Sequence, residues 1–595
     1  MRNIYQKKLI EDASKKFHDG DFSASRKICN GILTHDPNNS KILHLLSIIS
    51  LQFNDTKEAL DLSIRAQKIK PKDLAINNGL ALAYRANGKI TKALITLERI
   101  LENTKPESSF IEEIYANIGL IYYDMENFNI ALEFLNKALE KDPKHHTALV
   151  NKANTLRHLC KPVQAMKLYD EALNFGLSLE TVRKNKINLI NYTPNASLKD
   201  IYNITINYWD SVSKIKPSIL SNVSYSKNTE KKINVGYISP DFRTHTIGYF
   251  FQHLLNKVNK EKFNITLYYN HFTNDEVTKS ISNNCDKWRS VYKLSDSEIV
   301  NKIKSDEIDI LIDLAGHTDG NNLSVFRYKP APIQLTWLGY YATTGLKEID
   351  YIIADKYVLP EKYEYLYTEK PLRLNNSYLC FEPPNINLPL HSKKTSENQN
   401  IVFGSFNNIQ KVNMNTVRAW SEILNNIQKS FMFIKSPELS NVDIKESFMD
   451  LLINNGIKKE KIILNGKTSR FDHLNAYKHI DIILDTFPFN GGMTTAEALW
   501  MGIPTIVIEG DRWVSRVGSS ILNTVGLDKF ICKDFDEYID KAILLAKERG
   551  EREMLHRTLR TIITSSPLCN ASMFVKNLED QLSKKWDEYN TGLAS

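Results

Sequence analysis

The spacing of hydrophobic residues divides the chain into two parts at about residue 230. Before that point, apolar residues recur every three or four positions, which is the period of an amphipathic helix. After it, short apolar runs rich in Ile, Val and Tyr alternate with helical segments. The pattern predicts an all-helical first part followed by an α/β second part.

Proline and alanine recur in the first part at steps of 34 to 38 residues. The recurring positions are Pro37, Pro71, Pro106 and Pro143, together with Ala59, Ala93, Ala131 and Ala165. Helix pairs of the tetratricopeptide type repeat with a period of about 34 residues. In the clearest unit, 116–143, Gly119 and Ala131 would let two antiparallel helices approach closely. We predict an α solenoid, a superhelix of about five such repeats, over residues 1–178, with an inserted loop near 104–109.

A superhelix of this kind has a concave face that suits an extended protein or peptide. We expect protein acceptors to bind along this face. The alternative is a scaffold that only orients the chain or forms a homodimer through the repeats. Residues 179–230 lose the repeat pattern, and we interpret 197–216 as helical and 221–232 as a polar linker.

The second part contains two series of strand-like runs. The first series is 233–239, 263–269, 308–316, 333–340 and 349–355, and the second is 401–406, 431–436, 461–466, 481–487 and 504–510. A polar stretch at 388–400 separates them. We predict two doubly wound lobes, 231–395 and 396–595, with a ligand cleft between the carboxyl ends of their strands.

Composition excludes several classes of protein. Apolar residues make up 42% and charged residues 25% of 595 residues, which is typical of a globular protein rather than a disordered one. The net charge of +8 is spread along the chain without a basic block, so we expect no nucleic-acid partner. No apolar run approaches the ~20 residues of a membrane span, and the start lacks a signal-peptide core. Six scattered cysteines without a CxxC pair favour a reducing cytoplasm.

The segment 485–504, DTFPFNGGMTTAEALWMGIP, is the most informative for chemistry. It predicts a strand, a turn with Asn490, Gly491 and Gly492, and a helix that begins near Thr494 and Thr495. Glycines allow a backbone to approach a ligand, and N–H groups at a helix start bind anions. The segment therefore predicts a phosphate site, although an ordinary glycine turn before a capped helix has the same pattern.

Other polar side chains follow predicted strands. Asn408 and Lys411 come after the strand at 401–406, and a lysine there can neutralise a diphosphate. His245 and His317 follow two strands of the first lobe, and histidine is the side chain best suited to proton transfer near neutral pH. His473 precedes the strand at 481–487. Each residue alone could be an ordinary surface group. We find no DxD motif ahead of a glycine turn in the setting of a metal-bound diphosphate, and no HExxH or P-loop motif, so we expect neither a metal nor a cofactor besides the substrate.

Taken together, these segments resemble the protein O-linked N-acetylglucosamine transferase and SPINDLY family. The matching segments are GYISPDFRTH, LIDLAGHT, RYKPAPIQLTWLGY, IDYIIAD, FGSFNNIQK, LDTFPFNGG and TTAEALWMGIP. The resemblance covers nearly the whole chain and implies tetratricopeptide repeats followed by a two-lobed GT-B glycosyltransferase. It implies an inverting transfer from a nucleotide-sugar to Ser or Thr of proteins. A scaffold with degenerate lobes is the rival interpretation.

The resemblance also implies roles for individual residues. His245 matches the histidine that aligns or deprotonates the acceptor, and Lys411 matches the lysine that binds the diphosphate. The other matches contribute to donor binding: Asn408 near the phosphates, Thr494 and Thr495 on the diphosphate, His473 and Arg470 at the base, and Glu497 at the ribose. With His317, Asn490, Gly491 and Gly492 they form the expected donor site.

Two departures leave the donor sugar open. Met493 stands where the human-type enzyme has a histidine, and residues 341–345 replace a Pro-x-T-x-G loop. FGSFNN and AGHT lean toward the SPINDLY branch, whose plant member uses GDP-fucose. We expect N-acetylglucosamine from UDP, with fucose from GDP as the alternative.

Overall fold

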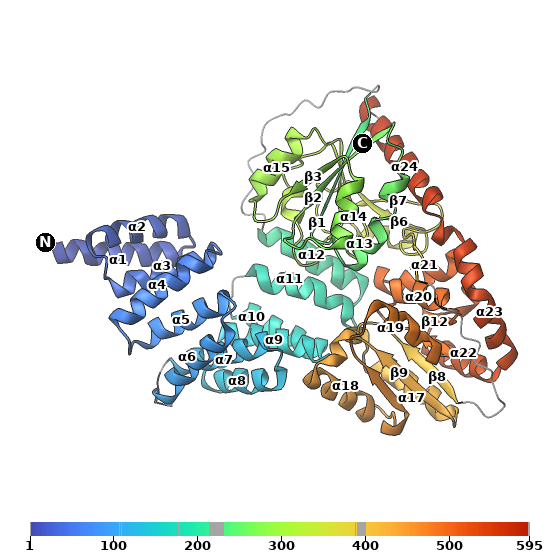
Figure 1. Cartoon of the computed structure of the whole chain (residues 1–595), viewed down its shortest axis with the longest axis horizontal. Helices are drawn as coiled ribbons and strands as arrows, with labels where there is room; N and C mark the ends of the chain where they lie inside the picture. The colour runs from blue at the N-terminus through green and yellow to red at the C-terminus, as the bar shows by residue number, and fades with distance from the viewer. Residues whose placement is uncertain are drawn as a thin grey trace. The chain divides into compact units, whose positions relative to one another are not determined.

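The computed structural model describes residues 2–105, 108, 110–175, 179–212, 231–386, 388 and 400–592. It separates into two compact units, Met1–Leu177 and Ser178–Ser595, which are described one at a time (Figure 1). Most of the predicted linker at 221–232, much of the polar break at 388–400 and part of the predicted loop insertion at 104–109 lie outside the described residues.

The first unit is a series of five helical hairpins in the part of the chain that the structure describes. The pairs are α1 (Arg2–His18) with α2 (Phe22–His35), α3 (Ser40–Gln52) with α4 (Thr56–Ile69), α5 (Leu74–Ala86) with α6 (Ile90–Glu102), α7 (Ile111–Asp124) with α8 (Phe128–Lys141), and α9 (His146–His158) with α10 (Pro162–Asn174). The repeats predicted from the sequence are confirmed.

The recurring small residues explain how each hairpin closes. Ala59, Ala93, Ala131 and Ala165 are completely buried. A Cβ atom added to Gly119 would lie 2.7 Å from Leu135 Cγ and 3.2 Å from the Ala131 carbonyl oxygen, so any side chain there would push α7 away from α8. Pro37, Pro71 and Pro143 each follow the second helix of a pair and prevent its continuation.

The second unit begins with α11 (Leu179–Leu189) and α12 (Leu198–Val212), which precede the first sheet. These helices pack on the first lobe. Trp209 donates from Nε1 to the Thr344 carbonyl oxygen at 2.7 Å, and Asn188 donates to the His317 carbonyl oxygen at 2.9 Å. The predicted helical link is thus part of the second unit.

The first lobe contains a seven-stranded parallel sheet with the order β3-β2-β1-β4-β5-β6-β7. Its strands are β1 (Ile233–Ser239), β2 (Phe263–Tyr269), β3 (Lys287–Ser290), β4 (Ile310–Asp313), β5 (Ile333–Thr336), β6 (Tyr351–Ala354) and β7 (Lys370–Arg373). Its helices are α13 (Thr246–Phe251), α14 (Glu276–Asn284), α15 (Asp296–Ser305) and α16 (Leu323–Phe326). The order places the ends of β1 and β4 side by side in the centre of the sheet.

The second lobe contains a six-stranded parallel sheet with the order β10-β9-β8-β11-β12-β13. Its strands are β8 (Ile401–Ser405), β9 (Ser430–Lys435), β10 (Ile462–Asn465), β11 (Ile482–Leu484), β12 (Thr505–Ile508) and β13 (Ile531–Cys532). Its helices are α17 (Met414–Asn426), α18 (Val442–Asn454), α19 (Arg470–Asn475), α20 (Met493–Trp500), α21 (Val517–Thr524), α22 (Phe535–Lys547) and α23 (Arg549–Ser565). The ends of β8 and β11 are neighbours, as a phosphate site at the sheet centre requires.

The last helix does not pack on the lobe to which the predicted division at residue 396 assigned it. Although α24 (Ala571–Thr591) follows the second sheet in sequence, it packs on the first lobe (Figure 1). Glu579 accepts a hydrogen bond from the Asn259 N–H at 2.7 Å, and Phe574 stacks on Trp337. Sequence order alone could not show this, because an amphipathic helix buries its apolar face against whichever sheet offers a matching groove.

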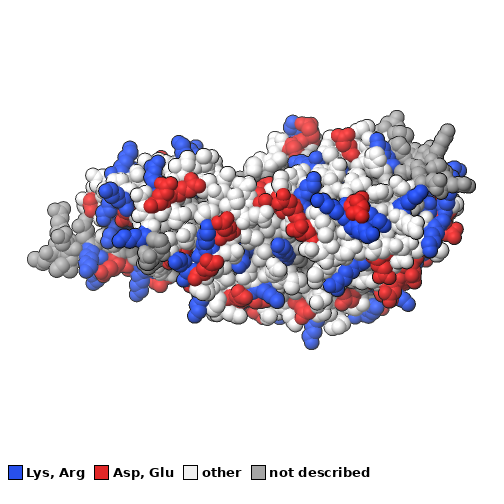
Figure 2. Space-filling view, turned by 90° about the horizontal axis from the view of Figure 1, so that it is seen from below, with Lys and Arg blue, Asp and Glu red and all other residues white. Residues whose placement is uncertain are grey.

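Three further features concern membrane-spanning helices, cysteines and the distribution of surface charge. No helix in the described ranges combines the length and apolarity that a membrane crossing requires. The six cysteines, all within these ranges, form no disulfide. On the face shown in Figure 2, positive and negative side chains are interspersed and neither sign gathers in a large patch.

Candidate active site

The carboxyl ends of the two sheets border a cavity of about 150 Å³. We call it the inter-lobe cavity. The first lobe lines it with Thr246, Ile247, Phe250, Leu338, Tyr341, Tyr378 and Leu379. The second lobe lines it with Asn407, Asn408, Lys411, Phe489, Asn490, Gly492, Met493, Thr494 and Val517. Of the residues predicted to form the site, five therefore meet at one place: Asn408, Lys411, Asn490, Gly492 and Thr494.

Lys411 supplies a positive charge at this cavity. It lies in the short turn after β8, donates from Nζ to the Asn490 carbonyl oxygen at 2.8 Å and sits 4.0 Å from the centre of the Phe489 ring. Burial lowers the pKa of Lys411 to about 8, and the Asp485 carboxylate opposes that shift. The ammonium group is still mostly charged at neutral pH, and its charge is poorly shielded because water is largely excluded.

Asp485, at the end of β11, organises the second lobe's side of the cavity. Its carboxylate accepts hydrogen bonds from Asn407 Nδ2 at 2.7 Å and from the Gly491 N–H at 2.8 Å. Burial raises the pKa of Asp485 to about 6, against the effect of these donors and of Lys411. Asn407 in turn accepts from Thr494 Oγ1 at 3.0 Å. The carboxylate thus fixes the position of the glycine turn, of Asn407 and, through Asn407, of Thr494.

The glycine turn leads directly into the start of α20. A Cβ atom on Gly491 would lie 2.5 Å from Thr494 Oγ1 and 2.7 Å from Thr495 Oγ1, so the close packing of these hydroxyls requires glycine. Gly492 is the N-cap residue of α20 and provides no side-chain cap. The first N–H groups of a helix have no partner within the helix, and they favour an anion.

Asn490 contributes an unsatisfied polar atom. Its Nδ2 donates to the carbonyl oxygens of Thr486 and Ile508, which fixes the orientation of the amide. Its Oδ1 is buried and has no hydrogen-bond partner among the described residues. A buried acceptor without a donor is unfavourable, and a ligand hydroxyl or N–H group would satisfy it. Asn408 is better satisfied, because its Nδ2 donates to Glu438 at 2.9 Å and its Oδ1 accepts from the Gln410 N–H.

A second group of predicted residues meets beside the cavity without lining it. The buried carboxylate of Glu497 lies 2.5 Å from Arg470 Nη2 and 3.5 Å from His473 Nε2. The His473 ring packs edge-on against Phe406, and the Arg470 guanidinium lies 5.9 Å from the centre of the Tyr249 ring in the first lobe. The structure thus brings together the three residues predicted to bind the nucleoside.

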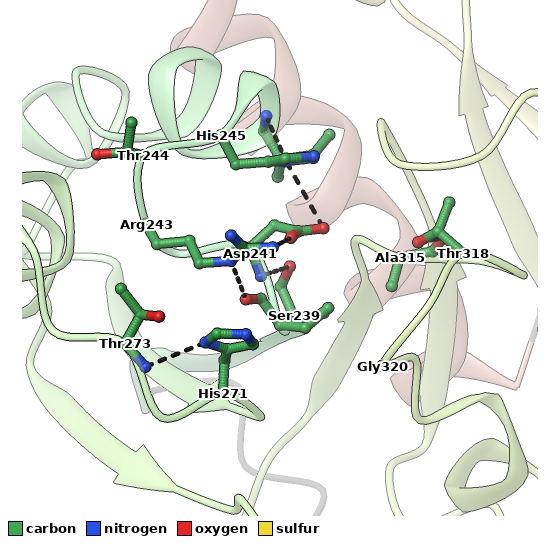
Figure 3. A network of polar contacts seen from close by, with 12 residues as sticks. Ser239, Asp241, Arg243, Thr244, His245, His271, Thr273, Ala315, Thr318 and Gly320 are labelled. Carbon is green, nitrogen blue, oxygen red and sulfur yellow. Dashed lines mark hydrogen bonds and ion pairs between the residues drawn. The ribbon is translucent and has the colours of Figure 1, made fainter. Parts of the chain in front are cut away.

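His245 lies at the start of α13, next to the cavity-lining residues Thr246 and Ile247. Its Nδ1 accepts from the Ile247 N–H at 3.3 Å and lies 3.6 Å from Asp241 Oδ2 (Figure 3). Burial and the nearby Arg243 lower the pKa of His245, while Asp241 opposes them. The ring is therefore held mostly neutral at pH 7, as a base or an aligning group requires.

His317 lies away from the inter-lobe cavity. It borders a separate cavity of about 270 Å³ with Tyr208, Trp209 and Arg327. Its Nε2 faces the Thr344 carbonyl oxygen at 2.8 Å and must therefore carry the hydrogen, and burial lowers the pKa of His317 to about 4. The structure gives no support for the predicted donor-binding role. Its hydrogen bond to Thr344 instead makes His317 one of the residues that fix the loop at 341–345.

Sequence reasoning gave no role to Asp485, Asn407 or Phe489. Asn407 and Phe489 line the cavity, and Asp485 holds Asn407 from behind it. Tyr341 and Met493, which belong to the two departures from the family pattern, also line the cavity. A signal for Asp485 existed, because a carboxylate that ends an apolar strand just before a glycine turn has backbone N–H groups close at hand.

The arrangement of strands, cavity and repeats can be compared with known proteins. The model of glycosyl transferase family 41 matches residues 210–400 and 381–578, which is more than half of the chain. The chain belongs to glycosyl transferase family 41. The tetratricopeptide repeat model matches residues 112–145, the hairpin α7–α8. These matches confirm the resemblance noted in the sequence.

Plant proteins are among the family 41 relatives. A Solanum lycopersicum protein named probable UDP-N-acetylglucosamine–peptide N-acetylglucosaminyltransferase SPINDLY is 31% identical over 414 residues, covering 69% of this chain and 44% of its own. A probable UDP-N-acetylglucosamine–peptide N-acetylglucosaminyltransferase of Arabidopsis thaliana, SEC, is 28% identical over 374 residues, covering 61% of this chain and 38% of its own. The chain thus matches less than half the length of these two relatives.

A solved structure agrees over a larger share of the fold. A variant of the O-GlcNAc transferase of Thermobaculum terrenum superposes with a TM-score of 0.76 at 25% identity, covering 87% of this chain and 98% of that chain. The agreement extends over both kinds of domain, and it confirms the predicted combination of helical repeats with a two-lobed α/β part.

Proposed function

We propose that this family 41 chain is an inverting glycosyltransferase that moves a sugar from a nucleotide diphosphate to Ser or Thr hydroxyls of proteins. One observation carries the proposal. The partly buried ammonium group of Lys411 and the uncapped start of α20 converge on one cavity at the carboxyl ends of both sheets. Two positive features at one enclosed position suit a leaving diphosphate.

The other residues of the site would each bind a different part of the donor. Thr494 lines the cavity at the start of α20 and offers its hydroxyl to the phosphates, while the buried Thr495 hydroxyl donates to the Gly491 carbonyl oxygen and supports the turn. The unsatisfied Asn490 Oδ1 suits a hydroxyl of the sugar. The cluster of Arg470, His473 and Glu497 suits the nucleoside. The acceptor hydroxyl would then approach from the His245 side, opposite the leaving group, as inversion at the anomeric carbon requires.

We propose UDP-N-acetylglucosamine as the donor. The support comes from the relatives, because the plant proteins and the Thermobaculum structure carry names that specify transfer of this sugar. GDP-fucose remains a competing donor to be tested. Because Lys411 and the helix start supply positive charge, we also propose that the reaction needs no divalent cation.

We propose further that the repeats of the first unit recognise the protein acceptor along their concave face. Stacked helical hairpins present an extended surface, and such surfaces commonly hold extended polypeptides. A scaffold that only forms a homodimer is the alternative.

The deciding experiment is mass spectrometry of a Ser- and Thr-containing peptide library after incubation with the full chain. UDP-N-acetylglucosamine and GDP-fucose are supplied in parallel, each with and without EDTA. We expect addition of one N-acetylhexosamine, unaffected by EDTA. Addition of a deoxyhexose from GDP-fucose would correct the donor, and loss of transfer in EDTA would contradict the charge assignment. Absence of transfer from both donors, with no donor binding by calorimetry, would overturn the proposed function.

A further inference from the structure

One nitrogen of His245 faces two partners that require opposite protonation. The Ile247 N–H donates to Nδ1 at 3.3 Å, while Asp241 Oδ2 lies 3.6 Å from the same atom (Figure 3). A ring nitrogen that accepts from an N–H group holds a lone pair, whereas one that bonds to a carboxylate must carry the hydrogen. The two contacts therefore select different tautomers of the neutral ring.

The tautomer decides what the other nitrogen can do. With the lone pair on Nδ1, Nε2 carries the hydrogen and cannot accept a proton from a hydroxyl. With the hydrogen on Nδ1, Nε2 has the lone pair that a general base needs. At 3.6 Å the Asp241 contact is longer than a hydrogen bond, whereas the Ile247 contact is within hydrogen-bond range, so the distances favour the first arrangement. Catalytic hydrogen bonds often shorten only when the reactants are bound.

Asp241 is held so that one oxygen points at His245. The residue is only 7% exposed, and its N–H donates to Ser239 Oγ at 3.0 Å. Arg243 Nη2 donates to Oδ1 at 3.1 Å, while Arg243 Nε donates to the Pro240 carbonyl oxygen. Figure 3 shows the ion pair on one side of the carboxylate and His245 on the other.

The remaining charged groups around this turn are engaged elsewhere. Asp275, the N-cap residue of α14, accepts from the Thr244 N–H at 2.7 Å. Arg470 of the second lobe pairs with Glu497 and lies over the Tyr249 ring. Among the described residues, Asp241 and Arg243 are thus the charged groups that act on the imidazole, and of these two only Asp241 can accept its Nδ1 hydrogen. The His245 side chain is 41% exposed, so water can exchange the proton between the two nitrogens.

We propose that Asp241 is a positioning residue that sets the tautomer of His245, an inference that rests on the transferase function proposed above. With both substrates bound, Asp241 Oδ2 accepts the Nδ1–H. Nε2 then takes the proton of the acceptor hydroxyl as the hydroxyl oxygen bonds to the anomeric carbon. The bond from that carbon to the diphosphate oxygen breaks, and its electron pair leaves with the diphosphate. The proton stays on the imidazole, and Asp241 remains ionised throughout.

The first test replaces the carboxylate without changing its shape. In Asp241→Asn the amide would donate to Nδ1 and retain the unproductive tautomer. We expect kcat to fall by on the order of 10²–10⁴, with unchanged donor affinity by calorimetry and an unchanged melting temperature. Asp275→Asn is the matched control, because it loosens the same turn without touching His245, and its kcat should stay within a factor of a few.

The second test asks whether Asp241 acts through His245. Asp241→Asn is combined with His245→Ala, and kcat is compared with that of His245→Ala alone. We expect no further loss in the double variant, because the group that Asp241 orients is already gone. Losses that multiply, or wild-type kcat in Asp241→Asn, would overturn the inference.

A spectroscopic readout follows the tautomer itself. Nitrogen NMR of the chain labelled in its histidines, with the His245 signals assigned by their absence in His245→Ala, distinguishes a protonated from an unprotonated Nδ1. On addition of UDP together with a Ser-containing acceptor peptide, which occupy both sides of the site without turnover, we expect Nδ1 of the wild type to gain its hydrogen and that of Asp241→Asn to remain unprotonated. Identical Nδ1 signals in both would overturn the inference while leaving the transferase function standing. Absence of binding by either donor would count against both.

Discussion

At the residue scale, Lys411 is the group on which the proposed chemistry depends most. Its partly buried ammonium group lies beside Asn490 and Phe489. Lys411→Ala should lower kcat by on the order of 10²–10³, as the loss of one strong electrostatic stabiliser does. Lys445→Ala, which removes an exposed lysine from α18, is the control and should have no effect. Turnover of Lys411→Ala close to wild type would show that Lys411 does not stabilise the leaving group.

The same lysine predicts a pH dependence. Because its pKa is lowered to about 8, Lys411 is charged below that pH and loses its charge above it. We therefore expect kcat/KM to be level near pH 7 and to fall as the pH rises through about 8, since kcat/KM reports the free enzyme. Lys411→Arg keeps its charge at high pH and should move the alkaline fall upward, whatever its absolute rate. An alkaline fall at the same pH in both forms would assign it to another group.

His317 predicts a pH dependence of stability rather than of activity. Its folded-state pKa of about 4 lies below the ordinary value of 6.5, because burial favours the neutral ring. The stability it contributes is complete above pH 6.5 and is lost as the pH falls toward 4, by at most about 3 kcal/mol. His317→Gln, whose amide can still donate to the Thr344 carbonyl oxygen, should be less sensitive to acid in urea unfolding. Equal acid sensitivity of the two forms would contradict this assignment.

At the element scale, the turn before α20 provides a direct test of the phosphate site. In Gly491→Ala the new Cβ would collide with the hydroxyls of Thr494 and Thr495, at 2.5 and 2.7 Å. We expect donor affinity to fall at least tenfold, because the Thr494 hydroxyl must move away from the phosphates and the Thr495 hydroxyl can no longer support the turn. Gly550→Ala in α23 is the matched control, since nothing lies within 4 Å of its added Cβ. Unchanged calorimetric affinity in Gly491→Ala would contradict the assignment.

Helices and strands were predictable from the sequence where the run of hydrophobic residues was long, or where glycine, proline or polar residues clearly marked its ends. The seven-residue strands β1 and β2 have the predicted limits. Strands β3, β7 and β13 were missed, because they are two to four residues long and the sequences KWRS and KPLR carry charges. Short edge strands take their conformation from the neighbouring strand, so their own sequence contains little signal.

The candidate site was predictable to a similar degree. Lys411 and the glycine turn could be predicted because they directly follow strands, and ligands of parallel sheets bind at the carboxyl ends of the strands. The contact between Asp485 and Asn407 could not be found, because the two residues lie 78 positions apart in the sequence, whereas the contact with Gly491 is local. His317 was assigned to the site by the same reasoning, because it also follows a strand. In the structure, however, the packing of α12 against Thr344 encloses His317 in another cavity.

At the scale of the whole molecule, the two units predict a separation of donor binding from acceptor recognition. A chain beginning at Leu179 removes the repeats but keeps α11 and α12, which pack on the first lobe through Trp209 and Asn188. The inter-lobe cavity lies wholly in the second unit. We therefore expect this shortened chain to bind and slowly hydrolyse the nucleotide-sugar like the full chain, while its turnover on protein acceptors falls at least tenfold.

The comparison needs two controls, because loss of the repeats could also destabilise the remaining unit. Donor affinity by calorimetry and the melting temperature show whether the cavity is intact, and light scattering shows whether the repeats alone form a dimer. A short Ser-containing peptide should be glycosylated equally by both chains, since it is too short to reach along an extended repeat surface. If the shortened chain keeps full turnover on protein acceptors, the repeats do not recognise the acceptor, and the scaffold interpretation is correct.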